Sequence, residues 1–120
     1  MSLDPTVVQS LPIATEDSTD VGRVVVEYLT TPMASCPRLP EVAADHESRI
    51  AFGEKKYGQR LKINNGRNPI MDLYQEYLDS LSYGMQAYLE TGDSFYLNTF
   101  KIVAAIADEI RLRLNKGTNG

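Results

Sequence analysis

The sequence has a single cysteine, Cys36, so it can form neither an intramolecular disulfide nor a cysteine-based zinc site. This composition is typical of a reducing compartment, and we expect a cytoplasmic protein. No apolar run approaches the roughly 18 residues that a membrane-spanning helix needs. The first residues also lack the basic and apolar segments of a signal peptide. Membranes are therefore not among the expected partners.

Positive charge is also scarce. The 12 lysines and arginines are outnumbered by 16 aspartates and glutamates, which gives a net charge of −4. Because nonspecific affinity for nucleic acids depends on massed Lys and Arg, nucleic acids are not expected partners either. The 120 residues, 42% of them hydrophobic, fit one globular domain with a core of modest size.

Helical periodicity dominates most of the chain. It predicts helices at about 40–58, 69–91 and 94–115. Asn68 and Pro69 are typical of a helix start, and Gly92 is typical of a helix end. The apolar residues of the last two helices recur at spacings of four and three: Ile70, Tyr74, Tyr77, Leu81, Met85 and Tyr88 in the first, and Tyr96, Phe100, Val103, Ala107, Ile110 and Leu114 in the second.

Residues 19–31 fit two structures. Val24, Val25 and Tyr28 recur at helical spacing, with Ser18 or Thr19 as a cap, whereas the run of valines beside a glycine favours a strand. A single strand would have nothing to pair with in an otherwise helical chain, so we predict a helix.

Two long helices joined by a short turn should lie antiparallel. We therefore predict an all-α protein, an antiparallel bundle of about four helices. An extended arm is expected at residues 1–18, a single helical domain at 19–116 and a frayed tail at 117–120. The apolar stripes are wide for so few helices, which predicts self-association as a homodimer or homotetramer.

Three acidic residues share one side of the helix predicted at 69–91. Asp72, Glu76 and Asp79 follow each other at spacings of four and three, with Tyr83 on the same side. Such carboxylates repel each other, and a divalent cation would turn the repulsion into attraction. Oxygen ligands of this kind suit Mg²⁺ or Mn²⁺. A solvated helix face explains the same pattern.

The segment QEYLDSLSY, which contains Glu76 and Asp79, resembles the second half of the metal motif of the all-α nucleoside-triphosphate pyrophosphohydrolases, the MazG-like superfamily. Residues 49–90, with their KYG and NGR motifs, look similar to its short phage and prophage members. In that superfamily a Glu and an Asp three residues later bind Mg²⁺ together with an acidic pair from the preceding helix. Here that helix lacks the Glu-x-x-Glu pair and offers Glu54 as one further ligand.

The resemblance implies a Mg²⁺-dependent or Mn²⁺-dependent enzyme, or a degenerate relative, that hydrolyses a nucleoside triphosphate to the monophosphate and pyrophosphate. It makes Glu76 and Asp79 the candidate catalytic residues and adds Glu54 as a third metal ligand. The candidate contacts to the nucleotide are Lys56, Asn65, Arg67 and Tyr83. The alternative is a noncatalytic, phage-derived helical oligomer that acts as an interaction or structural module.

The cations around the predicted loop have two interpretations. In an enzyme these cations would neutralise a triphosphate, and Arg67 could contact it through two nitrogens. They are Lys55, Lys56, Arg60, Lys62 and Arg67. In a noncatalytic protein they would be ordinary surface cations beside nearby acids. Asn65 is likewise explained by turn chemistry alone, because Asn-Gly tolerates positive φ.

Overall fold

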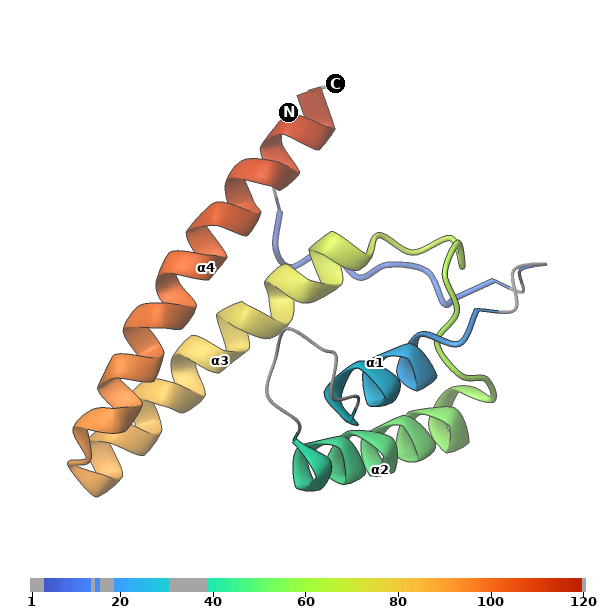
Figure 1. The fold of residues 1–120 in the computed structure, drawn as a ribbon. Helices are drawn as coiled ribbons and strands as arrows, with labels where there is room; N and C mark the ends of the chain where they lie inside the picture. Colours follow the sequence, from blue (N-terminus) through green and yellow to red (C-terminus); the bar gives the residue numbers. More distant parts are fainter. Residues whose placement is uncertain (1–3, 14, 16–18, 31–38, 120) are drawn as a thin grey trace. The chain divides into compact units, whose positions relative to one another are not determined.

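The computed structural model describes residues 4–13, 15, 19–30 and 39–119 (Figure 1). This part of the chain forms four α-helices and no strand, which confirms the predicted all-α class. The helices are α1 (Val21–Thr30), α2 (Pro40–Tyr57), α3 (Pro69–Thr91) and α4 (Ser94–Asn119). The ambiguous stretch at 19–31 therefore contains a helix, as predicted.

The chain divides into two compact units. One consists of Met1–Gln9 and Asn68–Gly120 and contains α3 and α4, and the other consists of Ser10–Arg67 and contains α1 and α2. The polypeptide thus passes between the units twice, at Gln9–Ser10 and at Arg67–Asn68.

Helix α3 begins and ends at the predicted residues, because both ends are capped. The side-chain oxygen of Asn68 accepts hydrogen bonds from the backbone N–H groups of Ile70 and Met71, at 3.0 and 3.2 Å. Pro69 occupies the first position, where its missing N–H costs nothing. At the other end Gly92 adopts φ 70° and its N–H donates to the carbonyl of Tyr88.

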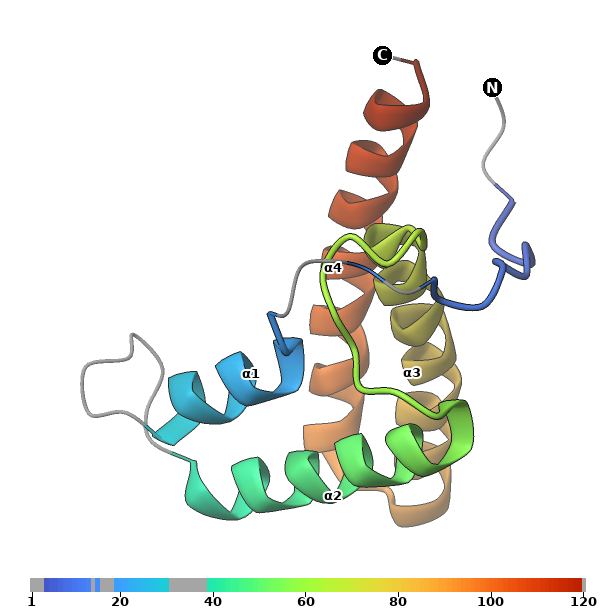
Figure 2. The ribbon, with the colours of Figure 1, turned by 90° about the vertical axis from the view of Figure 1, so that its right-hand side faces the viewer.

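The core of this unit lies where the start of α3 meets the later part of α4. Tyr74 packs with Ala107, Ile110 and Leu114, and Met71, Tyr77 and Leu78 pack against this cluster. Both views show α3 and α4 side by side (Figures 1 and 2). The predicted stripes thus face each other, although Ile70 stays 47% exposed. From Gln75 to Ile106 every residue is at least partly exposed, so the buried core is confined to one end of the helix pair.

Helix α4 differs from its prediction at the C-terminal end. Its start is capped by Asp93, whose carboxylate accepts from the N–H of Phe95 at 2.9 Å. Its end lies at Asn119 instead of 115, so the frayed tail predicted from residue 117 is helical up to Asn119. Leu114, one of the best buried residues, anchors the turns around it and favours this extension.

Helices α1 and α2 form the second unit and lie side by side (Figure 2). Gly22 is buried in α1, and a side chain at this position would collide with Cδ1 of Ile50. The cap of α1 is Asp20, whose carboxylate accepts from the N–H of Arg23 at 3.3 Å, and not Thr19 as one of the two alternatives had it. The other alternative, Ser18, lies outside the described residues.

The contact at Gly22 generates a stability prediction. Gly22→Ala should destabilise the protein by about 1–3 kcal/mol, because the added methyl group overpacks the site against Ile50. The matched control is Gly53→Ala in α2, where nothing lies within 4 Å of the new methyl group. That variant should be neutral or more stable by up to about 1 kcal/mol, because alanine favours a helix over glycine. Urea unfolding measures both, and equal effects would contradict the close packing of α1 on α2.

Candidate functional site

The predicted acidic stripe on α3 divides into two parts with different surroundings. Asp72 is partly buried, and its carboxylate accepts a hydrogen bond from Nε2 of Gln9 at 2.9 Å. Glu76 and Asp79 are exposed, and within the part of the chain that the structure describes neither carboxylate has a hydrogen bond or an ion pair. The pair Glu76–Asp79 is therefore the part of the stripe that remains open to a cation.

The three predicted metal ligands do not belong to one unit. Glu76 and Asp79 lie in the unit of α3 and α4, whereas Glu54 lies exposed on α2 in the other unit. Among the described residues no group of three or more His, Cys, Asp or Glu side chains could hold a metal ion. Two carboxylates one helical turn apart still fit a hydrated hard cation, because Mg²⁺ keeps several waters and often takes only one or two protein carboxylates.

Asn65 and Arg67, predicted to contact a nucleotide, have structural partners. Asn65 is only 8% exposed, and its side-chain oxygen accepts from the N–H of Arg67 at 3.1 Å. Its backbone carbonyl accepts from the N–H of Ile13 at 2.7 Å. Nη1 of Arg67 donates to the carbonyl of Ser10, also at 2.7 Å. The Asn65 side chain therefore closes the turn, in line with the turn chemistry weighed from the sequence. The Arg67 side chain and the Asn65 backbone hold residues 10–13.

The other two candidates for nucleotide contacts remain accessible. The Lys56 ammonium group lies 5.2 Å from the ring centre of Tyr57 on the exposed side of α2. Tyr83 is 68% exposed on α3. They belong to different units, so both are exposed but the structure does not define one shared site.

Arg60 is held in an ion-pair network that the sequence did not predict. Its Nε lies 2.6 Å from Oδ2 of Asp20, and its Nη1 lies 3.2 Å from Oε1 of Glu47. Burial alone would raise the pKa of Asp20, but the hydrogen bond from the Arg23 N–H and the positive charge of Arg60 lower this pKa below its ordinary value. The network ties the start of α1 to α2 and to the segment after it, so Arg60 has a structural role.

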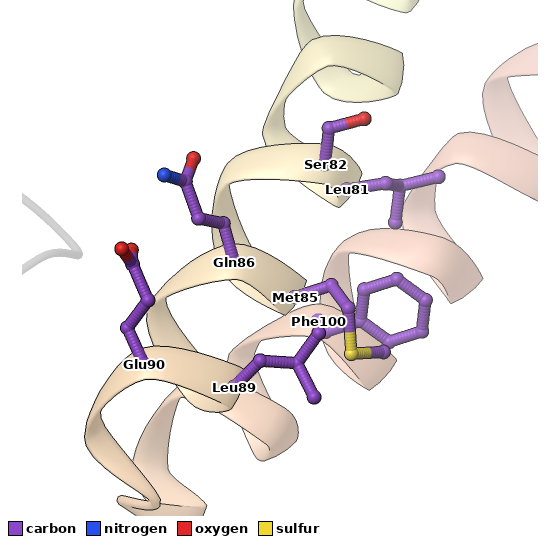
Figure 3. A pocket seen from close by; sticks show the side chains of 7 residues that line it. All are labelled: Leu81, Ser82, Met85, Gln86, Leu89, Glu90 and Phe100. Carbon is purple, nitrogen blue, oxygen red and sulfur yellow. The ribbon is translucent and has the colours of Figure 1, made fainter.

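A shallow and mostly apolar groove lies on the helix pair α3–α4 (Figure 3). Leu81 and Met85 lie beside the ring of Phe100, whereas Gln86 and Glu90 extend away from that ring. The remaining lining residues are Ser82 and Leu89. A nucleotide site needs several polar side chains that point to the same place. In this groove the polar side chains of Gln86 and Glu90 extend away from the apolar lining, so it does not fit a nucleotide. It lies in the part of the pair that has no fully buried residue.

Comparisons with protein-family models, with curated proteins and with solved structures find no match to this chain. The resemblance to the MazG-like superfamily therefore stays a prediction. A search of the described helices for a segment both long and apolar enough to cross a membrane finds none.

The lowered pKa of Asp20 generates a prediction about pH. A carboxyl whose pKa is lower in the folded than in the unfolded state stabilises the protein above the unfolded value, near 3.9, and loses this contribution as the pH falls. Asp20→Asn keeps a capping side chain but removes the charge. The melting temperature of the native protein should exceed that of Asp20→Asn near neutral pH, and the gap should shrink below about pH 5.

The control is Glu109→Gln, which breaks the exposed ion pair with Arg113 at 3.0 Å on α4. This variant should change the melting temperature little at any pH, because exposed pairs contribute little. A gap between the native protein and Asp20→Asn that stays constant from neutral to acidic pH would contradict the assignment.

Proposed function

We propose that this chain is a MazG-like helical protein that binds Mg²⁺ or Mn²⁺ through Glu76 and Asp79 and hydrolyses a nucleoside triphosphate to the monophosphate and pyrophosphate. The observation that carries this proposal is the pair itself. Two exposed carboxylates stand one turn apart on α3, and neither has a cationic partner among the described residues. The similarity of residues 49–90 to the phage-type members of the superfamily supports the same function in the cytoplasm.

The contribution of the chain is to hold two negative charges in place on a capped helix. Their mutual repulsion costs a few tenths of a kcal/mol when no cation is present. A bound divalent ion would supply positive charge that polarises the phosphoryl oxygens. One carboxylate of the pair would orient the attacking water and accept its proton. Tyr83, exposed on the same helix, is the proposed contact to the nucleotide. Glu54 and Lys56 belong to the other unit and stay predictions from the sequence.

Self-association belongs to the same proposal. We infer that α3 and α4 run antiparallel and that copies of the chain pair as a homodimer or homotetramer. The support is the uneven burial along α3 and α4, where no residue from Gln75 to Ile106 is fully buried. Phe95, Ile102 and Ile106 also lie exposed on α4, at helical spacing. Covering such apolar surface contributes about 25 cal/mol per Å².

A noncatalytic helical oligomer is the second candidate, and a different observation favours it. Two of the side chains expected to contact a nucleotide have structural partners: Asn65 accepts from the Arg67 N–H within the turn, and Arg67 donates to the Ser10 carbonyl. Among the described residues no group of three His, Cys, Asp or Glu side chains could hold a metal ion. An interaction module needs only the helices and their apolar faces, and the acidic pair would then be a solvated surface.

Metal titration separates the two candidates. If the pair binds Mg²⁺, millimolar Mg²⁺ should raise the melting temperature, because a ligand bound only by the native state stabilises it, by about 1.4 kcal/mol at ten times its dissociation constant. The double variant Glu76→Gln, Asp79→Asn should lose this rise. Without metal it should melt at the same temperature as the native protein or slightly higher.

The matched control is Glu90→Gln, which removes an exposed carboxylate near the other end of α3 and should leave the rise intact. Release of pyrophosphate from the common nucleoside triphosphates is measured on the same variants. If millimolar Mg²⁺ and Mn²⁺ leave the melting temperature unchanged and no pyrophosphate appears, the enzyme proposal fails and the interaction module stands.

A further inference from the structure

The start of α3 holds the N-terminal arm through side-chain hydrogen bonds. The Gln9 carboxamide accepts from the N–H of Asn68 and donates to the Asn68 carbonyl at 3.1 Å and to Asp72 at 2.9 Å. Nε2 of Gln75 donates to the carbonyls of Pro5 and Val7, both at 2.9 Å. We call Asn68, Asp72 and Gln75 the clasp. It binds the backbone carbonyls of Pro5 and Val7 and the side chain of Gln9.

The next part of the arm is bound separately. The carbonyls of Ser10 and Pro12 accept from Arg67 and Gln59, at 2.7 and 3.3 Å, and the N–H of Ile13 donates to Asn65 at 2.7 Å. These partners all belong to the unit of α1 and α2, and the division between the units falls between Gln9 and Ser10. The hydrogen bonds of residues 10–13 therefore do not involve the clasp, and they stay the same whichever chain fills it.

Apolar burial contributes little to holding residues 4–9 in the clasp. Val8 is 94% exposed and Val7 is 45% exposed, so the arm presents its apolar side chains outward. The hydrogen bonds of the clasp are each worth about 0.5–1.5 kcal/mol net. Pro5 lies in a turn in which the N–H of Val7 donates to the carbonyl of Asp4 at 3.4 Å and the N–H of Thr6 donates to the Asp4 carboxylate at 2.9 Å.

We propose that the clasp also takes residues 4–9 of a second copy, so that two copies exchange their arms. The clasp makes the same hydrogen bonds whichever chain supplies the arm, so these bonds do not oppose exchange. The balance is then set by the cost of association against the apolar surface that the second copy covers. This inference specifies a contact for the self-association proposed above and does not depend on hydrolysis.

Single-cysteine variants of the full chain test the exchange. Both chains carry Cys36→Ser. One carries Gln9→Cys, and the other carries Asp72→Cys and a tag that makes it longer. After the chains are mixed and incubated at high concentration, a mild oxidant is added and the products are separated without reductant. Exchange predicts that the main product is a disulfide between position 9 of the short chain and position 72 of the long chain. Adding Gln75→Ala to the long chain should lower its yield several-fold.

Two controls make the result decisive. Ser48→Cys, exposed on α2, replaces Asp72→Cys in a matched pair and gives the yield of random collision. One chain that carries both Gln9→Cys and Asp72→Cys shows whether the two sulfurs can reach each other. If this chain links internally while the mixed chains link no better than the Ser48 pair, exchange is wrong. Should light scattering then still show an oligomer, self-association stands without it.

Discussion

The contact of Tyr74 with Ala107, Ile110 and Leu114 is the interaction on which the helix pair α3–α4 depends. It is the cluster of buried apolar residues in this unit, and it lies at one end. Helix α3 is held by this contact and by its two caps. The carboxylates of Glu76 and Asp79 follow directly after Tyr74 on the same helix, so the position of the candidate metal ligands depends on the packing of that residue.

The same arrangement divides the polar residues between structure and function. Asp72 is engaged by the arm, and Asn65 and Arg67 hold residues 10–13, while Glu76 and Asp79 are left exposed. The proposed cation site thus consists of residues that the fold leaves exposed. Uneven burial along α3 and α4 has a related consequence, because the half without buried residues is where a second copy can add most to stability.

Periodicity and end signals made the helices predictable. Asn68, Pro69 and Gly92 fixed the bounds of α3, because caps act through neighbouring residues in the sequence. The apolar stripes of α3 and α4 were predictable from helical periodicity, because it too is a pattern among residues close in the sequence. The ion pairs of Arg60 with Asp20 and Glu47 were not, because residues far apart in sequence leave no periodic signal. The burial of Asn65 and the hydrogen bonds of the clasp were not predictable either, because they depend on contacts with the N-terminal arm, which is more than 50 residues away in the sequence.

Hydrogen exchange measured residue by residue on the dilute protein tests the account most directly. If the Tyr74 cluster holds the pair α3–α4 together, the slowest amides of that unit should lie at residues 71–78 and 107–114. Amides between Gly84 and Phe100 should exchange faster, because no residue there is fully buried. Slowest exchange around Gly92, with fast exchange near Tyr74 and Leu114, would contradict the claim that the pair is anchored at this one end.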